Sequence, residues 1–340
     1  MKHKIVFFNL EPWAKEHLEE NSELKRREIE VVFESSTLDK DHVPGEKNFD
    51  IAGIFVDSVV GREVLENLPN LKSIVTLSTG YDHIDIDACK RRNVAVSFVP
   101  SYGENTVAEF TFGLLISLAR KICDGHNRVR ETGSFNLDGL RGFDLAGKTL
   151  GVIGTGRIGR HVIRIAKGFE MDVVAFDVRP DAGLADELGF TYLSFEEALG
   201  KSDIVTLHVP YMKETHHLLN HDTINLMKRG AYLVNTSRGG VVETEALVKA
   251  LKEGQLAGAA LDVLEEEGAV KDELNLLVGG KIEEHNLKVI LANHVLIDMP
   301  NVLITPHNAF NSREALERIL ETSIENIIAY VEGKSVNVVT

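Results

Sequence analysis

Three side chains in the second half of the chain have types that suit proton transfer beside a carboxylate. Arg238 comes just after the apolar run 232–235, and its planar guanidinium could hold a carboxylate at two points and polarise a neighbouring carbonyl. His307 follows the run 303–306, which Pro306 ends. Because histidine titrates near neutrality, this ring could donate a proton when a carbonyl is reduced and accept one when an alcohol is oxidised.

Glu267, the third of these side chains, closes the acidic triplet 265–267. Its carboxylate could pair with His307, orient the ring and stabilise the protonated form that donates. Each residue also has an ordinary interpretation. An acidic run is usually solvated surface, Arg238 could be a surface residue at a helix start, and any one of 13 histidines is more often structural. The functional interpretation depends on the motifs around them.

Residues 148–160 carry the pattern Gly154-x-Gly156-x-x-Gly159 between a short apolar run and an amphipathic segment. Gly154 would make a tight turn, Gly156 would let the backbone approach a pyrophosphate, and Gly159 would let a helix pack on the strand. The first amides of that helix would face the phosphates. The sequence therefore predicts a dinucleotide site, whose loop also contains Thr155, Arg157 and Ile158.

Asp177 ends the next apolar run, 171–176, and lies 23 positions after Gly154. An acidic residue about 20 positions on is typical of a carboxylate that accepts hydrogen bonds from the adenosine ribose. The same charge would repel a 2′-phosphate, which predicts NAD as the cofactor. Arg179 could meet such a phosphate, so some use of NADP stays open.

Strands and helices alternate along the chain, which predicts parallel sheets with right-handed crossovers. Apolar runs predict strands at 4–8, 30–33, 51–56, 74–77, 95–97, 190–192, 204–207, 231–235, 258–262 and 302–305. Helices are expected at 11–27, 62–67, 85–92, 106–121 and 313–331, and residues 124–147 are expected to form a connection. A helix after the last strand could pack back on the first domain and make that domain discontinuous.

Composition narrows the class of protein. A length of 340 residues is enough for two domains, and a formal net charge of −15 argues against binding to nucleic acid or an anionic membrane. No signal peptide is recognisable, and the apolar stretch 107–119 is too short to span a bilayer. Cys89 and Cys123 have neither disulfide nor metal-binding spacing, so we expect reduced thiols, no metal site and a cytoplasmic protein.

Taken together, these segments resemble the D-isomer-specific 2-hydroxyacid dehydrogenases over nearly the whole chain. The resemblance is carried, in the family's order, by STGYDHID at 78–85, VAE at 107–109, GVIGTGRIG at 151–159, LHVP at 207–210, VNTSRGG at 234–240, ALDV at 260–263 and ITPH at 304–307. It implies an α/β protein with two doubly wound parallel sheets, usually a homodimer. We expect a discontinuous flavodoxin-like catalytic domain at 1–100 and 309–340, and a Rossmann NAD-binding domain at 101–308.

The resemblance also implies roles for residues. Arg238 would bind the carboxylate and carbonyl of a small 2-oxo acid, His307 would be the acid and base, and Glu267 would orient it. The backbone amides of Ser78, Thr79 and Gly80 would bind the carboxylate. Tyr102 and Phe310 would line the substrate pocket. Cofactor contacts are expected from Asp262, beside the nicotinamide carboxamide, and from the strand-end residues His208, Val209, Pro210, Thr236, Ser237 and Arg238.

The substrate is less narrowly defined. Gly268 follows Glu267, where relatives that reduce glyoxylate, hydroxypyruvate or phosphohydroxypyruvate usually have proline, and His307 lies 40 positions after Glu267. Both features resemble the D-lactate dehydrogenase branch, although Leu77 stands where many of its members have arginine. Pyruvate is therefore favoured, with a glyoxylate, hydroxypyruvate or phosphoglycerate type of enzyme as the alternative. An NAD-sensing corepressor, which can retain the same residues, is the alternative from another class of protein.

Overall fold

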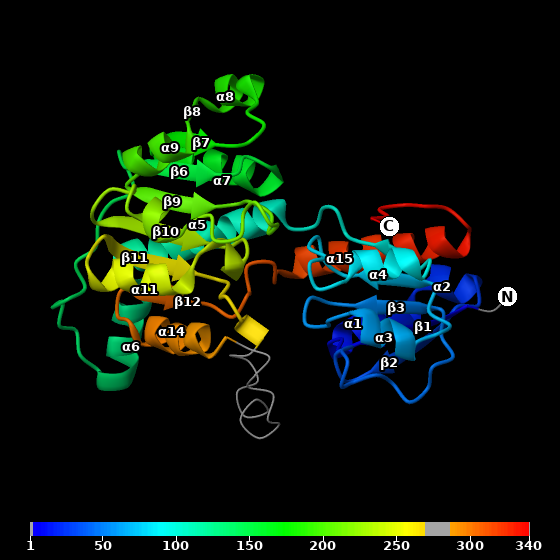
Figure 1. Ribbon diagram of the computed structural model, residues 1–340. Helices are drawn as coiled ribbons and strands as arrows, with labels where there is room; N and C mark the ends of the chain where they lie inside the picture. Colours follow the sequence, from blue (N-terminus) through cyan, green and yellow to red (C-terminus); the bar gives the residue numbers. More distant parts are fainter. Residues whose placement is uncertain (1–2, 269–285, 340) are drawn as a thin grey trace. The chain divides into compact units, whose positions relative to one another are not determined.

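The computed structural model describes residues 3–268 and 286–339, and the chain in it divides into two compact units (Figure 1). The first unit contains Met1–Tyr102 and Ser312–Thr340, and the second contains Gly103–Asn311. The first unit is thus discontinuous in sequence. Its two segments flank the second unit in the chain, close to the boundaries expected at 100 and 308.

The first unit is built on a five-stranded parallel sheet with the strand order β2-β1-β3-β4-β5. The strands are β1 (Lys4–Phe8), β2 (Glu30–Glu34), β3 (Ile51–Ile54), β4 (Ser73–Thr76) and β5 (Ala95–Ser97). This order is the doubly wound, flavodoxin-like one. Every residue of β3 and β4 is buried, as expected for a sheet with helices on both faces.

The helices of the first unit are α1 (Pro12–Glu20), α2 (Ser22–Arg26), α3 (Arg62–Asn67), α4 (Ile86–Arg91) and α15 (Arg313–Val331). The single helix predicted at 11–27 is wrong, because the chain breaks at Asn21. The Asn21 side chain accepts hydrogen bonds from the backbone N–H groups of Glu23 and Leu24, and so caps a second helix.

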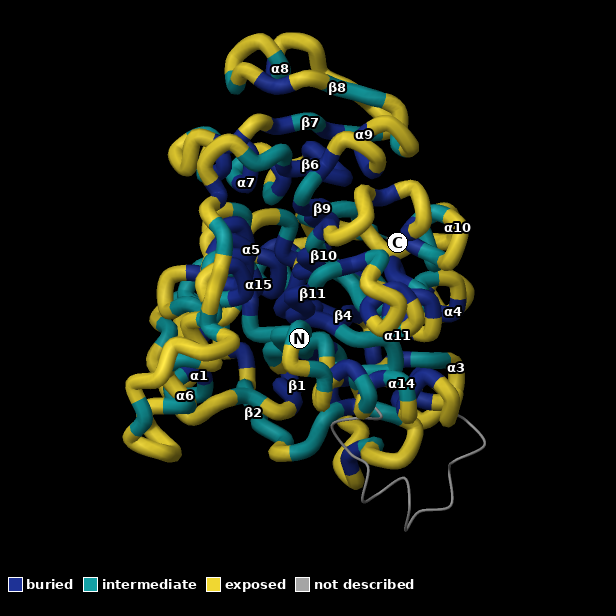
Figure 2. Tube along the Cα trace, turned by 90° about the vertical axis from the view of Figure 1, so that its left-hand side faces the viewer, coloured by how far each residue is buried: buried dark blue, intermediate teal, exposed yellow. Residues whose placement is uncertain are grey.

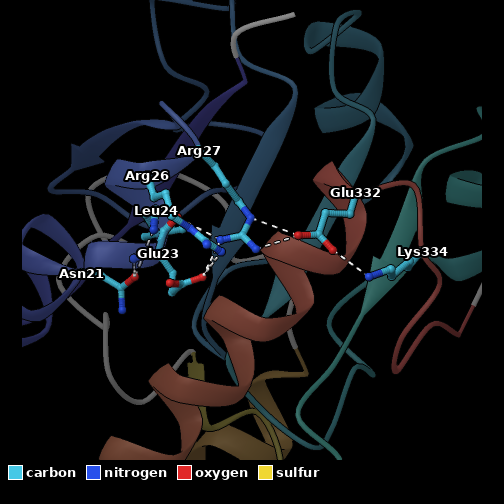
Figure 3. A network of polar contacts seen from close by, with 7 residues as sticks. All are labelled: Asn21, Glu23, Leu24, Arg26, Arg27, Glu332 and Lys334. Atoms are coloured by element: carbon cyan, nitrogen blue, oxygen red, sulfur yellow. Dashed lines mark hydrogen bonds and ion pairs between the residues drawn. The ribbon is translucent and has the colours of Figure 1, made fainter.

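Polar contacts join the two segments of the first unit (Figure 3). The Arg27 guanidinium, at the end of α2, lies 2.6 Å from Glu332 Oε1 and 2.6 Å from Glu23 Oε2. Glu332 follows α15 and also pairs with Lys334. Hydrogen bonds from Lys334 and Arg27 lower the pKa of Glu332 to about 2, so this carboxylate stays charged at neutral pH.

The segment after α15 also covers the edge strand β5. Val338 pairs with Ser97 in antiparallel fashion, and the Val339 N–H donates to the Val96 carbonyl. Asn326 on α15 donates to the Phe98 carbonyl and accepts from Asn337. The edge of the sheet is thereby closed by residues more than 200 positions away in the sequence.

The second unit contains a seven-stranded parallel sheet with the order β12-β11-β10-β9-β6-β7-β8. Its strands are β6 (Thr149–Ile153), β7 (Asp172–Phe176), β8 (Thr191–Tyr192), β9 (Ile204–Leu207), β10 (Ala231–Asn235), β11 (Leu256–Leu261) and β12 (Val302–Ile304). The order reverses between β6 and β9, as in dinucleotide-binding doubly wound sheets. The two-sheet α/β fold class expected from the sequence is therefore confirmed.

Helices cover both faces of this sheet, and Figure 2 shows β9, β10 and β11 buried between them. One apolar cluster joins α5 and α7 to the strands, and the other joins α9, α11 and α14 to the opposite face. The helices of the second unit are α5 (Glu104–Arg120), α6 (Ile122–Thr132), α7 (Arg157–Gly168), α8 (Ala182–Leu188), α9 (Phe195–Lys201), α10 (His221–Ile224), α11 (Thr244–Lys252) and α14 (Leu287–Asp298), with a 3₁₀ turn, η1, at Gly239–Val241.

The expectation of a plain connection at 124–147 is wrong in its first part. Residues Ile122–Thr132 form α6, which begins after Lys121 in the left-handed conformation and ends at Gly133, also left-handed. None of its residues is buried. Among the described residues, no helix is both long and apolar enough to cross a membrane.

Candidate active site

The glycine-rich loop lies at the carboxyl end of β6, where the strand order of the sheet reverses. Gly154 adopts φ +96°, and a Cβ atom there would lie 2.6 Å from the His208 carbonyl oxygen at the end of β9. A Cβ atom on Gly159 would lie 2.1 Å from the Gly154 oxygen. Both positions therefore require glycine, the first for its conformation and the second for the close approach of α7 to its own loop.

Gly156 has a different environment, which fits a bound phosphate. It is the N-cap of α7, is exposed, and a Cβ atom there would meet no atom within 4 Å. The first turn of α7 contains no acidic residue. Open space and uncompensated positive helix-end charge are what a pyrophosphate needs, so the residues present fit a dinucleotide. Thr155 is buried under this loop, whereas Arg157 is exposed and Ile158 is half-buried.

Asp177, at the end of β7, is fixed against the same loop. Its Oδ2 accepts hydrogen bonds from Thr155 N at 2.7 Å and Thr155 Oγ1 at 3.0 Å, and its Oδ1 accepts from Arg179 N at 2.9 Å. Tyr192 contributes a further hydroxyl contact to Thr155. The carboxylate expected to meet the ribose is thus held in one orientation, and its residue is only partly buried.

His307 and Glu267, which are 40 positions apart in the sequence, are in contact. The distance from His307 Nδ1 to Glu267 Oε1 is 2.7 Å, with the side chains 17% and 33% exposed. With Nδ1 turned to the carboxylate, Nε2 is the nitrogen left for a substrate. His307 adopts φ +52°, an uncommon conformation for a residue other than glycine. The Phe310 ring packs edge-on against the His307 ring, with 6.4 Å between the two ring centroids.

Asp262 holds the turn that carries His307. This buried carboxylate accepts hydrogen bonds from Thr305 Oγ1 at 2.6 Å, Asn308 N at 2.8 Å and Ala309 N at 2.8 Å. The His307 N–H also donates to the Asp262 carbonyl. Burial raises the pKa of Asp262, and these hydrogen bonds oppose the rise. A positioning role for Asp262 was not part of the sequence prediction, which gave it only a cofactor contact.

Asn235 does the same for the turn that carries Arg238. Its Oδ1 accepts from Ser237 N and Oγ, at 3.0 and 2.7 Å, and its Nδ2 donates to the Arg238 carbonyl at 2.9 Å. The Arg238 guanidinium is partly buried and donates to the Ser237 carbonyl. Thr236 is buried and its hydroxyl contacts that of Thr111 on α5. Asn235 was missed because its position predicts only a strand end.

His208 is unsuited to be the proton donor. Burial of its ring lowers the pKa of His208 to about 3, so the imidazole is neutral near pH 7. Its Nε2 contacts Thr206 Oγ1, and its buried Nδ1 has no hydrogen-bond partner in the part of the chain that the structure describes. Val209 and Pro210 follow it at the rim of the sheet, half-buried and exposed.

In the first unit, the hydroxyl groups of the loop after β4 form hydrogen bonds within the unit. The Ser78 hydroxyl donates to the Gly80 carbonyl and contacts Thr76 Oγ1, which in turn lies 3.1 Å from His83 Nε2. The Thr79 hydroxyl donates to the Val99 carbonyl. Because these hydroxyl groups are used within the unit, a role of residues 78–80 in binding an anion would fall to their backbone amides, which stays an expectation from the family resemblance.

The backbone of Tyr102 binds an arginine from a distant segment of the chain. Its carbonyl accepts a 2.6 Å hydrogen bond from Arg318 Nε, on α15. Both residues belong to the first unit and both are partly buried. Arg318 lies 216 positions from Tyr102, so the sequence of the loop around Tyr102 gives no sign of it.

Comparison with known proteins gives consistent matches. The profile of a family described as D-isomer specific 2-hydroxyacid dehydrogenase, NAD binding domain, matches residues 112–309. A 2-hydroxyacid dehydrogenase homolog from Zymomonas mobilis is 40% identical over 308 residues, 90% of each chain. A D-lactate dehydrogenase from Curvularia clavata is 36% identical, covering 97% of this chain and 93% of that one. A glyoxylate reductase from Thermococcus litoralis is 38% identical, covering 82% and 80%.

Solved structures agree over the whole length. The pyruvate reductase of Chlamydomonas reinhardtii superposes with a TM-score of 0.85 at 33% identity, covering 98% of both chains. A D-lactate dehydrogenase from Aquifex aeolicus, solved with NAD and lactic acid, gives a TM-score of 0.80 at 35% identity, covering 97% of this chain and 96% of that one.

Proposed function

The chain belongs to the D-isomer specific 2-hydroxyacid dehydrogenase family, and on that premise we propose that it reduces pyruvate to D-lactate and catalyses the reverse reaction. NAD-dependent reduction of a 2-oxo acid follows from the family itself. The observation that supports the assignment of the chemistry is the pairing of His307 with Glu267, on a turn held by Asp262 at the carboxyl end of the sheet.

The residues of this chain divide the work as follows. NADH, when bound at the Gly154–Gly159 loop and Asp177, supplies the hydride. Arg238 binds the substrate carboxylate at two points and polarises the carbonyl. His307 Nε2 gives its proton to the carbonyl oxygen as the alcohol forms, and takes it back in the reverse direction. Glu267 accepts a hydrogen bond from Nδ1 and stabilises the protonated ring. Residues 78–80 are proposed, from the family resemblance, to offer backbone amides to the carboxylate.

Two features support pyruvate over a phosphorylated acid. The loops 9–13, 57–60, 78–82 and 100–104 contain no lysine or arginine and several acids. A second phosphate charge would need such a cation. Relatives named D-lactate dehydrogenase and pyruvate reductase are among the matches.

A panel of 2-oxo acids with NADH tests this proposal. We expect pyruvate to have a higher kcat/KM than glyoxylate by about tenfold, because a methyl group in an apolar pocket is worth about 10–200-fold. Phosphohydroxypyruvate should be the poorest substrate. Chiral analysis of the product of pyruvate reduction should give D-lactate. L-lactate, or a clear preference for the phosphorylated acid, would contradict the proposal.

Glyoxylate reduction is the second candidate, because glyoxylate reductases are also among the relatives. A higher kcat/KM for glyoxylate than for pyruvate in the same panel would select it. An NAD-sensing corepressor is the candidate of another class, and binding of NADH without turnover of any 2-oxo acid would select that one. We also propose a cytoplasmic location, because Cys89 and Cys123 have neither disulfide nor metal-binding spacing.

We also propose that the protein is a homodimer formed through the second unit. Phe135 and Leu137, in the segment after α6, are 84% and 78% exposed, and Ile122 and Val129 on α6 are exposed as well. Apolar side chains grouped in this way are typical of an interface. Light scattering should give about twice the chain mass of 37.6 kDa. The double variant Phe135→Ser, Leu137→Ser should be monomeric, and a monomeric wild type would refute the dimer.

A further inference from the structure

Glu265, two positions before Glu267, has a side chain that is only 15% exposed and makes three polar contacts. Its Oε1 lies 2.7 Å from His217 Nε2. Its Oε2 accepts from Thr244 Oγ1 at 2.7 Å and from Thr244 N at 3.1 Å. Thr244 begins α11, whose own N-cap, Glu243, makes no side-chain capping bond. Glu265 therefore caps α11 from a distant segment, and is not the solvated residue that an acidic triplet suggests.

The backbone beside Glu265 is fixed by two further elements. Asn293, a fully buried residue on α14, donates to the Glu265 carbonyl at 2.7 Å. Gly239 packs directly on Leu264, the residue before Glu265, since a Cβ atom on Gly239 would lie 2.0 Å from the Leu264 carbonyl carbon. The Leu264 N–H in turn faces Glu267 Oε2 at 3.4 Å. The segment leading to Glu267 is thus held from the side of α11, from α14 and from η1.

His217 extends these contacts toward the turn that follows Arg238. Its backbone N–H donates to the Gly240 carbonyl at 2.9 Å, while its ring contacts Glu265. Tyr211 packs against Gly240, where a Cβ atom would lie 2.7 Å from the ring. The Glu265 carboxylate and the His217 ring therefore link the segment that carries Glu267 to the segment that carries Arg238.

We propose that Glu265 is a positioning residue for the reaction, which holds the segment 264–267 so that Glu267 stays against His307. This inference rests on the proposed function, in which that pair moves the proton. Glu265 acts through Glu267 and touches no reacting atom. A cap for α11 alone would affect stability without changing turnover, so the two roles can be separated by kinetics.

The first test compares Glu265→Gln with the wild type in reduction of the preferred 2-oxo acid. An amide keeps the volume of the side chain but can accept with one oxygen only, whereas Glu265 accepts with both. We expect kcat to fall by about tenfold to 10²-fold, the cost of a small misplacement of catalytic groups. The dissociation constant of NADH should change by less than about twofold, because Glu265 is not among the residues expected to hold the cofactor.

Glu197→Gln is the matched control. Glu197 is a carboxylate in the capping box of α9, in the same unit, where it accepts from the backbone N–H of Ser194. The substitution makes the same chemical change at a helix start, at a side chain that is not among the expected site residues. We expect a similar small loss in Tm and an unchanged kcat. A fall in kcat shared equally by Glu197→Gln and Glu265→Gln would overturn the proposal.

The second test is a double-mutant cycle with Glu267→Gln. If Glu265 acts through Glu267, the two effects should not multiply, and the double variant should have nearly the kcat of Glu267→Gln alone. His217→Asn, which breaks the contact from the other side and tolerates the φ of +51° at this position, should behave in the same way and serves if Glu265→Gln does not fold.

The outcomes distinguish a failure of the proposed function from a failure of the positioning role of Glu265. A wild type that turns over no 2-oxo acid overturns the proposed function, and this inference with it. If the wild type is active but the kcat of Glu265→Gln lies within about twofold of it, this inference is overturned and the proposed function stands. The same holds if the effects of Glu265→Gln and Glu267→Gln on kcat multiply in the cycle.

Discussion

Replacement of His307 by alanine should lower turnover by about 10²–10⁴-fold, the usual contribution of a positioned acid or base. The loss should appear in kcat for 2-oxo acid reduction, because the ring would deliver the proton that the alcohol oxygen needs. Binding of NADH, measured by fluorescence titration, should be nearly unchanged, since the residues expected to hold the cofactor are retained. Turnover within tenfold of the wild type would reject His307 as the acid and base.

Two further variants make this result specific. Because His307 adopts φ +52°, alanine also strains the backbone, and His307→Asn removes the proton donor with a residue that accepts this conformation. Both variants should lose activity alike. His221→Ala, at an exposed histidine on α10, should keep it. Equal losses in all three variants would point to a fault in folding.

The pH profile tests the partner of His307 in the same experiment. Reduction requires the protonated ring and oxidation of the alcohol requires the neutral one, so raising the pH should slow the first reaction and speed the second. Removing the Glu267 charge with Glu267→Gln destabilises the protonated ring, so the alkaline limb of reduction should move to lower pH. An unmoved limb would remove Glu267 from the mechanism.

Arg238→Lys should lower kcat/KM for the 2-oxo acid by about 10²-fold, the scale of losing one donor that stabilises developing charge. A single ammonium group cannot reproduce the planar two-point grip of a guanidinium on a carboxylate. The turn around it should persist, because Asn235 bonds to the backbone of Ser237 and Arg238.

The control for this variant is Arg229→Lys, at an arginine that donates to the Glu253 carbonyl and lies on the exposed surface. It makes the same exchange of cation in the same unit and should keep wild-type kinetics. Steady-state kinetics with varied 2-oxo acid measure both variants. Unchanged kcat/KM in Arg238→Lys would return that residue to the ordinary surface interpretation.

The sheets could be predicted from the sequence because their strands are apolar over most or all of their length, as in β3, β4 and β9. The helices were harder to predict from the sequence. The break at Asn21 depends on a single side chain, which caps a new helix. A continuous helix would have nearly the same composition, so composition does not indicate the break. α6 has few apolar residues and buries none of them, so apolar periodicity is only a weak indication of a helix there.

In the candidate site, too, only features that depend on local sequence could be predicted. Glycine positions at 154 and 159 follow from a local motif, because the contacts they permit are made within one strand–turn–helix unit or with the adjacent strand. The contacts of Asp262 with the His307 turn, of Asn293 with Glu265 and of Arg318 with Tyr102 join segments 28 to 216 positions apart. No spacing rule links such residues, so only the fold could reveal them.

The split of the first unit has a consequence for how the protein is made. A ribosome delivers residues 103–311 before residues 312–339, so the second unit is fully synthesised while the first still lacks α15. Until α15 arrives to pack beside β4, and residues 337–339 to pair along β5, that sheet keeps an apolar face and an edge strand open. The strands made first are therefore the last to be completed, and their apolar face and open edge stay exposed on the nascent chain until then.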